Sequence, residues 1–235
     1  MSKKIAKVLF VKVGRVTENK KLNSDKNFSS GIKKYPLKSA YLGKIGFFDD
    51  EQADTLHHGG ITKAVLFFSA DTYEKINKLA NSSFRYDEVA YFGENLLVDD
   101  INEEDICVGD ILKIGDAQIE ISQPRQPCWK LSANTKIKNM TSIIYNNGLT
   151  GWYGRVLEYG EISQKDDIFL IKRKYPKLTI SALNKIIVNP LSDMELTKEA
   201  IKCKVLGDAF KESLKARAKL KDPVNEPFLY HKEED

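Results

Sequence analysis

The sequence has 235 residues, of which 42% are hydrophobic and 30% charged, which argues against a fibrous or wholly disordered chain. The formal net charge of +4 is small for this length. It gives no support for a nucleic-acid partner, and we expect none. Cys107, Cys128 and Cys203 are odd in number and widely spaced, which argues against a disulfide framework and a cysteine-rich zinc module. A reducing cytoplasm is the expected setting.

The N-terminal residues predict a strand rather than a targeting segment. The apolar run from Val8 to Val11 ends at Lys12. It is far shorter than the roughly 18 apolar residues of a membrane-spanning helix or the roughly 7–15 of a signal-peptide core. We therefore expect no export and no membrane partner, and residues 5–13 are the first strand candidate.

Short apolar runs separated by Gly, Asp and Pro fill residues 4–173, a pattern typical of β-rich structure with a few inserted helices. Residues 64–68 predict a buried strand. Residues 111–114 and 117–121 are two β-type runs on either side of the pair Gly115-Asp116. Glycine at the first position of a two-residue loop suits a type II′ hairpin, so these runs predict a strand pair.

Two helices are expected within this β-rich region. The first covers residues 71–80, where Asp71 and Glu74 have the spacing of a capping box. The second is indicated by apolar residues that recur at helical spacing over 137–144, with Gly148 as its stop signal.

The composition changes after Arg173 to segments rich in Leu, Ala, Lys and Glu. They predict three short helices, over residues 179–188, 192–204 and 208–221. The expected N-caps are Thr179, Ser192 or Asp193, and Asp208. The expected organisation is a β-barrel-like domain at 1–173, a three-helix segment at 174–222 and a polar tail at 223–235.

The segment richest in chemical groups surrounds Cys128. Pro124 and Pro127 fix their own φ and push the preceding residues toward extended conformations, so this loop is expected to be stiff. The neighbouring cations Arg125 and Lys130 favour the thiolate, the form of cysteine that attacks substrates and binds metals. A buried structural thiol remains equally open on composition alone. The other two cysteines are expected to be structural.

A second cluster contains the adjacent His57 and His58, followed by Gly59 and Gly60. Backbone N–H groups of such a glycine pair can approach an anion closely. Successive side chains of an extended segment point to opposite sides, so only one of these histidines is expected to serve a site. A solvated turn before the next strand is the alternative interpretation.

A third segment places Glu94 and Asn95 directly after a glycine. Taken alone, this arrangement is better explained as a turn cap than as a site.

Several short motifs, in this order, are similar to those of the MOSC family, named after the C-terminal part of molybdenum cofactor sulfurases, and of its bacterial YiiM-like branch. They are GIKKYP (31–36), DEQAD (50–54), HGG (58–60), KAV (63–65), FGENL (92–96), VGD (108–110) and QPRQPCWKL (123–131). The chain departs from the family pattern at FDD (48–50), where a Gly-Asp pair is usual, and at Ile61-Thr62, where Pro-Asp is common.

The resemblance implies a β-barrel that binds molybdopterin, with Cys128 as the thiolate ligand of molybdenum. By motif position, the polar residues expected around the metal are Lys34, His58 and Cys128, and the further pocket residues are Gly59, Gly60, Glu94, Asn95 and Arg125. A soft thiolate suits a redox-active transition metal, and the dithiolene of the cofactor would supply most other ligands. The cations available for the pterin phosphate are Arg125, Lys63, Lys130 and Arg155, and the sequence does not choose among them.

The implied activity is a molybdenum-dependent reduction of N-hydroxylated compounds, such as N-hydroxylated nucleobase analogues, in detoxification. Two electrons and two protons would convert the N–OH group to an amine and water. Lys34 and His58 would orient the leaving oxygen or relay protons, a role that suits histidine because its unperturbed pKa is about 6.5. The sequence has no Gly-x-Gly-x-x-Gly fingerprint and no iron–sulfur cysteines, so a separate electron-donating reductase is the expected partner.

Two alternatives remain open. The protein could be a carrier that binds the cofactor, or holds sulfur on Cys128 as a persulfide, and delivers it without catalysing reduction. It could also be a hydrolase in which His58 activates Cys128 while Asp54 orients the histidine. The hydrolase leaves the motifs around Lys34, Glu94 and Arg125 without an explanation.

Overall fold

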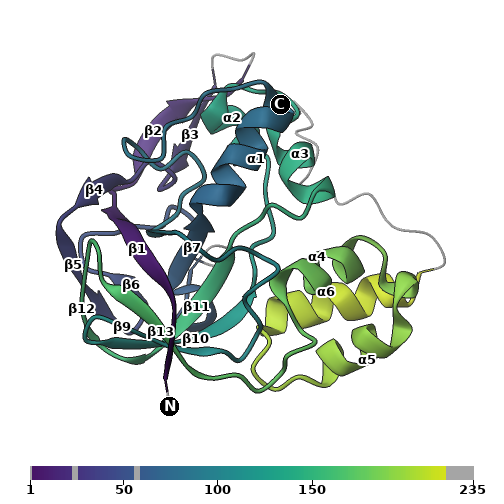
Figure 1. Ribbon diagram of the computed structural model, residues 1–235. Coiled ribbons are helices and arrows are strands. Elements are labelled where there is room, and N and C mark those ends of the chain that lie inside the picture. Colours follow the sequence, from purple (N-terminus) through teal and green to yellow (C-terminus); the bar gives the residue numbers. More distant parts are fainter. Residues whose placement is uncertain (1, 23–25, 56–58, 221–235) are drawn as a thin grey trace.

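Figure 1 shows the computed structural model, which describes residues 2–22, 26–55 and 59–220. The strands are β1 (Lys3–Val13), β2 (Thr17–Lys20), β3 (Asn27–Ser30), β4 (Tyr35–Leu37), β5 (Ser39–Gly43), β6 (Gly46–Phe47), β7 (Val65–Ser69), β8 (Leu96–Val98), β9 (Ile111–Ile114), β10 (Ala117–Pro124), β11 (Trp152–Glu158), β12 (Gly160–Ser163) and β13 (Asp167–Lys172). The α-helices are α1 (Ala70–Ala80), α2 (Lys130–Thr135), α3 (Met140–Asn146), α4 (Ile180–Val188), α5 (Met194–Lys202) and α6 (Asp208–Ala218), and the 3₁₀ helices are η1 (Ile61–Lys63) and η2 (Pro190–Ser192).

Seven strands close into a barrel. The ring of hydrogen-bonded neighbours runs β1, β13, β9, β10, β11, β7, β8 and back to β1. The pairs are antiparallel except for β7 and β8, which run parallel with Phe67 opposite Leu96. Alternate residues of each strand point inward, as in β10, where Ala117, Ile119 and Ile121 are buried. The predicted fold class is therefore confirmed: a β-barrel with inserted helices, followed by C-terminal helices.

The α-helices gather at two places around the barrel. Figure 1 shows α1, α2, α3 and the β2–β3 hairpin above the barrel, and α4, α5 and α6 to its right. The apolar face of α1 packs with α3, and both contribute to a second buried cluster that contains Phe68, Tyr73, Phe92 and Ile144. The upper group of elements therefore has its own small core and can form a rigid wall above the barrel.

The strands indicated by the sequence are confirmed. The candidates at 5–13 and 64–68 correspond to β1 and β7. The runs around the Gly115-Asp116 pair form the β9–β10 hairpin, with Ala117 opposite Ile114. Gly115 has a φ of 52°, the sign that a type II′ turn requires at its first loop position.

Helix starts were predicted less accurately. Thr179 and Asp193 cap α4 and α5 as expected, and their side chains accept the N–H groups of Ala182 and Leu196. The N-cap of α1 is Ser69, two residues before the predicted capping box, because the last residue of β7 accepts the Asp71 N–H at 3.2 Å. The N-cap of α6 is Gly207 rather than Asp208, which is the first helical residue. The α3 helix begins at Met140, and the sequence pattern did not indicate the short α2.

The C-terminal helices share the hydrophobic core of the barrel. Leu183 of α4 and Phe210 and Leu214 of α6 belong to the same buried cluster as Val108 and Ile121. The division at residues 173 and 222 stays a prediction, and the tail at 223–235 lies outside the described residues. Among the described residues, no helix combines the length and apolar character needed to cross a membrane.

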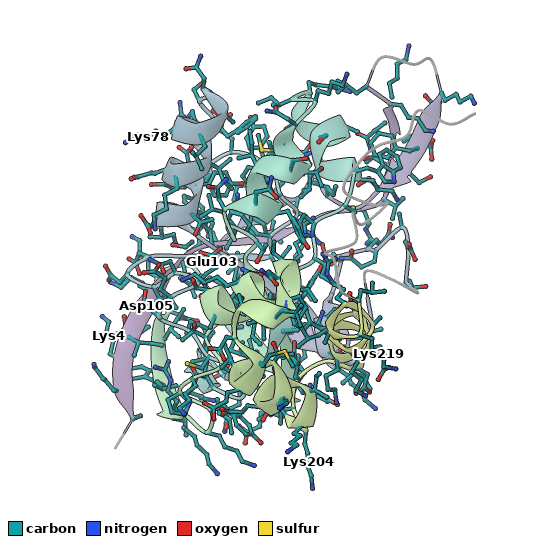
Figure 2. The ribbon with its side chains drawn as sticks, turned by 90° about the vertical axis from the view of Figure 1, so that its right-hand side faces the viewer. Lys4, Lys78, Glu103, Asp105, Lys204 and Lys219 are labelled. Atoms are coloured by element: carbon teal, nitrogen blue, oxygen red, sulfur yellow. The ribbon has the colours of Figure 1, made fainter. Side chains whose placement is uncertain are left out.

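A buried carboxyl group lies where barrel and helices meet. Glu103, labelled in Figure 2, accepts hydrogen bonds from the Thr72 hydroxyl at 2.7 Å and the Gly151 N–H at 2.9 Å. Its backbone carbonyl accepts the Ser181 N–H of α4 at 2.7 Å. Burial raises the pKa of Glu103, and the two hydrogen bonds to the carboxyl group oppose that shift. One loop residue thus ties α1, the start of β11 and α4 together.

Candidate functional site

Cys128 lies in the loop that joins β10 to α2. Its carbonyl accepts the Leu131 N–H and the Thr141 hydroxyl, each at 3.0 Å. The preceding Gln126 donates to the Ser213 hydroxyl of α6 at 3.4 Å. These contacts fix a loop already restricted by Pro124 and Pro127. The thiol of Cys128 is half-buried, whereas Cys107 and Cys203 are buried.

The loop forms one wall of a small pocket, with a cavity volume of about 50 Å³. The lining residues come from the β3–β4 connection, the segment before the undescribed residues 56–58, the β7 and β8 region, the Cys128 loop and β11. They are Ser30, Gly31, Ile32, Gln52, Ala53, Asp54, Leu66, Phe92, Gly93, Arg125, Cys128, Lys130 and Tyr153. Three predicted site residues, Arg125, Cys128 and Lys130, thus meet at one cavity.

Arg125 places a buried positive charge at this pocket. The residue is 4% exposed, and its N–H donates to the Gly151 carbonyl at 3.2 Å. Its Nε and Nη1 atoms are buried and have no hydrogen-bond partner among the described residues. A buried guanidinium with unused donors costs free energy unless an anion or a polar group satisfies it. The pocket is therefore suited to a negatively charged ligand group.

Tyr153 of β11 lies beside both Arg125 and Cys128. Burial raises the pKa of its hydroxyl, the guanidinium of Arg125 opposes that shift, and the Cys128 side chain adds to it. The hydroxyl group consequently stays protonated at neutral pH and can act as a hydrogen-bond donor inside the pocket. Tyr153 was not expected as a site residue, because a tyrosine in a β-strand is common and carries no positional signal.

Lys34 lies behind the pocket, in an ion pair with Asp50. The Lys34 ammonium donates to both carboxylate oxygens of Asp50, and the two side chains are 2% and 5% exposed. Burial lowers the pKa of Lys34, while the charges of Asp50 and Glu94 oppose that shift. Lys34 is not among the residues that line the pocket. Its connection to the pocket runs through Gln52, which lines the cavity and donates to Asp50 Oδ2 at 3.2 Å.

A second buried ion pair joins Lys12 of β1 to Glu94. Lys12 Nζ and Glu94 Oε1 are 2.7 Å apart, and both side chains are fully buried. Glu94 also accepts the Tyr73 hydroxyl at 2.8 Å and the Phe92 N–H at 3.3 Å. Burial and the Glu94 carboxylate raise the pKa of Tyr73 well above its usual value, so its hydroxyl stays a donor. The predicted pocket residue Glu94 thus supports the pocket wall from behind.

Asn95 connects the two ion pairs. Its Nδ2 donates to Asp50 Oδ2 at 2.9 Å and to the Lys12 carbonyl at 3.2 Å, and its Oδ1 accepts the Leu66 N–H at 3.2 Å. The Gly14 N–H donates to Asp50 Oδ1 at 3.0 Å. We call Lys12, Lys34, Asp50, Glu94 and Asn95 the buried charge cluster.

The glycine pair leads into η1. Gly60 has a φ of 91°, a conformation that glycine adopts without strain, and its carbonyl accepts the Lys63 N–H at 2.9 Å. Burial lowers the pKa of Lys63 and Asp54 opposes that shift, which places Lys63 close to an acidic residue of the pocket wall. Gly59 directly follows the gap in the described residues. His57 and His58 lie outside the described residues, and the predictions about them stay predictions.

Arg155 lies away from the pocket. Its Nη2 donates to the carbonyl of Val205, in the turn between α5 and α6, and its Nε lies 3.6 Å from the Glu120 carboxylate. Of the four cations proposed for the pterin phosphate, Arg125 and Lys130 line the cavity. The contacts of Arg155 instead attach the C-terminal helices to the barrel.

Two residues of the buried charge cluster were not identified as site residues from the sequence. Lys12 interrupts the apolar end of β1, and a lysine inside a buried strand requires a charged partner, which is a usable signal. Asp50 belongs to the DEQAD motif, but no local pattern shows that its partner is Lys34, 16 residues earlier.

The comparisons with known proteins give the family. The MOSC domain family matches residues 54–169 of the chain. The protein YflK of Bacillus subtilis (strain 168) is 33% identical over 189 residues, which cover 80% of this chain and 84% of that protein. The chain belongs to the MOSC domain family. A protein named YiiM, from Escherichia coli (strain K12), is 32% identical over 132 residues, 56% of this chain and 59% of that protein.

Two further matches add a name and a fold. A protein of Gibberella moniliformis named "Reductase" is 33% identical over 148 residues, 63% of this chain but 26% of that longer protein. The crystal structure of YiiM from Geobacillus stearothermophilus has a TM-score of 0.73 at 23% identity, covering 90% of this chain and 98% of that one. The structural match shows a common fold.

The three cysteines should differ in reactivity. Cys128 lines an open pocket next to cations, whereas burial raises the pKa of the Cys107 thiol to about 11, and Cys203 is 3% exposed. We expect iodoacetamide to alkylate Cys128 in the native protein at least about tenfold faster than the other two. Peptide mass spectrometry after timed labelling measures the rates. In urea the three rates should converge, and equally fast native labelling of Cys107 or Cys203 would contradict the prediction.

The Lys34–Asp50 pair should be strongly coupled. Asp50→Asn leaves the buried Lys34 charge without its counterion, so we expect a loss of about 3–5 kcal/mol in the free energy of unfolding, measured in urea. The double variant Lys34→Met/Asp50→Asn should recover most of that loss. Arg15→Ala is the matched control, because Arg15 forms its ion pairs with Asp49 and Glu51 on the surface. It should cost less than about 1 kcal/mol. Additive effects of the two cluster substitutions would show that no coupling exists.

Proposed function

We propose that this protein binds the molybdenum cofactor in the Cys128 pocket and reduces N-hydroxylated compounds, with N-hydroxylated nucleobase analogues as the expected substrate class and detoxification as the role. One observation carries the proposal: a half-buried thiol and a buried guanidinium with unused donors line the same pocket of a MOSC barrel. The relative named "Reductase" supports the reaction class.

The pocket residues fit an anionic cofactor that carries its own metal. Arg125 would hold a phosphate or another anionic group of the cofactor through Nε and Nη1, with Lys130 at the same wall. Among the described residues, no three His, Cys, Asp or Glu side chains converge to hold a metal ion. A thiolate from Cys128 is the single protein ligand that molybdenum would need when the dithiolene supplies the others.

The reaction requires a reductant and protons from outside the substrate. Its balance is R–NH–OH + 2 e⁻ + 2 H⁺ → R–NH₂ + H₂O. The bound cofactor supplies the two-electron redox chemistry. The protein would hold the substrate in the pocket, where the protonated hydroxyl of Tyr153, a lining residue, would donate a hydrogen bond to the leaving oxygen.

Lys34 would act indirectly in this site. Lys34 orients the Asp50 carboxylate, which accepts a hydrogen bond from the side-chain amide of the pocket residue Gln52. The Lys34–Asp50 pair therefore fixes the Gln52 amide, which can donate and accept hydrogen bonds, in the pocket wall. We also propose His58 as a proton-relay group. Its motif follows shortly after the segment that ends at Asp54, and this segment lines the pocket.

The direct test compares cofactor content and turnover in protein expressed in a host that makes molybdopterin. We expect wild-type protein to retain molybdenum and to reduce an N-hydroxylated purine with dithionite as the electron source. Cys128→Ser should lose both properties, whereas Cys107→Ser, the control, should keep them because Cys107 is buried away from the pocket. Metal retention without turnover would support the carrier alternative, and metal loss in both well-folded variants would refute the site.

The adjacent histidines should differ in importance. His58→Ala is expected to lower turnover by about tenfold to a thousandfold, the range for losing an oriented proton donor or a polarising hydrogen bond. His57→Ala should change turnover less than about threefold, because successive side chains of an extended segment face opposite sides. Steady-state reduction of an N-hydroxylated purine at matched cofactor occupancy measures both. A larger loss at His57 would place the motif one residue out of register.

A further inference from the structure

Positive charge is concentrated in one part of the sequence. Between Glu120 and Glu158 there is no aspartate or glutamate. The same stretch contains Arg125, Lys130, Lys136, Lys138 and Arg155. It includes the Cys128 loop, α2 and α3, so the walls on this side of the pocket carry no negative side chain of their own.

Contacts to the β2–β3 hairpin add further lysines to this region. Lys136, at the C-terminal end of α2, donates to the Lys20 carbonyl at 3.1 Å. The ammonium of Lys21 lies 5.7 Å from the ring centroid of Trp129, the residue next to Cys128. Figure 1 shows the hairpin beside α2.

Lys130 joins these lysines to the pocket. Its ammonium donates to the Ser29 carbonyl of β3 at 3.0 Å and lies 5.9 Å from the Trp129 ring centroid. Lys130 also lines the cavity, as does Ser30 of β3. We call Lys20, Lys21, Lys130 and Lys136 the basic face, and this face adjoins the pocket.

The ammonium groups of the basic face are not neutralised by neighbouring acids in the described part of the chain. The partners of Lys21, Lys130 and Lys136 are backbone carbonyls and the Trp129 ring. The nearest acidic residue in sequence, Glu18 of β2, accepts a hydrogen bond from the Ser29 hydroxyl. Such a face attracts an acidic surface and orients it during diffusional encounter.

We propose that the basic face docks an acidic electron-transfer protein, so that the redox group of this partner is delivered beside the pocket. The inference rests on the proposed function, in which two electrons must come from another redox centre. The partner is a one-electron carrier with a carboxylate-rich surface around its flavin or iron–sulfur cluster. Two reduced carriers are each oxidised by one electron for every N–OH group reduced, and two protons come from solvent.

The arrangement of Trp129 favours this partner over a nucleic acid. Single-stranded nucleic acids bind by stacking bases on exposed aromatic rings. Trp129 instead packs edge-on against Phe28, with ring centroids 5.0 Å apart, and the ammonium groups of Lys21 and Lys130 lie over its ring. The basic face is also built from lysines, which act as point charges, rather than from the bidentate arginines that suit phosphate recognition.

The test uses a reduced plant-type ferredoxin as the acidic donor and dithionite as the small-molecule donor. The variant Lys20→Glu/Lys136→Glu reverses two exposed charges of the basic face. The control Lys78→Glu/Lys204→Glu reverses two exposed charges on α1 and after α5, and Figure 2 shows both control residues at separate edges of the molecule. None of these four lysines lines the pocket.

We expect the basic-face variant to raise the KM for ferredoxin by about tenfold or more, and the control to change it less than about twofold. Turnover with dithionite should be unchanged in both. Raising the ionic strength from about 0.05 to 0.5 M should weaken ferredoxin-supported turnover of the wild type, because the charges are then screened.

Three results would overturn the inference: equal KM changes in the two variants, wild-type turnover with dithionite but none with ferredoxin, or basic-face substitutions that weaken binding of a short fluorescent DNA without changing the ferredoxin KM. The last result would assign the face to nucleic acid. Absence of turnover with either donor in molybdenum-loaded protein would instead refute the proposed function.

Discussion

The buried charge cluster is the constraint on which the site depends. Two lysines and two carboxylates are removed from water, and each charge would be costly alone. The structure pairs Lys12 with Glu94 and Lys34 with Asp50, and Asn95 joins the pairs through one donor to Asp50 and one to the Lys12 backbone. Because these residues belong to β1, the segment before β4, the turn after β6 and the segment before β8, the cluster holds four distant parts of the chain at one point.

This cluster explains how a pocket can be held open above a packed barrel. Glu94 binds the Phe92 N–H, and Asp50 binds the Gln52 amide, and both Phe92 and Gln52 line the cavity. The pocket walls are therefore attached to charges that cannot move without losing their counterions. Arg125 differs from the clustered lysines, because two of its buried nitrogens have no partner among the described residues. The charges of the buried charge cluster are thus neutralised by ion pairs, whereas the positive charge of Arg125 lies at the pocket.

The sequence predicted what depends on local patterns. The β9–β10 hairpin, β7 and the caps at Thr179 and Asp193 follow from periodicity and from residues within four positions of one another. The closure of β13 onto β1 and the Lys34–Asp50 pair depend on contacts distant in sequence, and no local rule specifies them. Arg125, Cys128 and Lys130, which motif resemblance singled out, line one cavity, and their roles in a site stay predictions. Within the departure at residues 48–50, Asp49 has a φ of 66°, a conformation that aspartate adopts more readily than most residues.

Net charge proved to be a poor guide to the surface. The total of +4 results from 37 basic and 33 acidic residues, and it describes an average over the whole chain. Acidic side chains are absent from the stretch between Glu120 and Glu158, which holds the Cys128 thiol, the buried Arg125 guanidinium and α2. Folding then brings Lys20 and Lys21 to the same place through the contacts of Lys136 and Trp129. Inside the pocket, positive charge suits an anionic cofactor, and at its edge it suits an acidic partner. The stretch without acidic residues, together with the two lysines that folding adds to it, therefore accounts for both properties without changing the near-neutral balance of the whole protein.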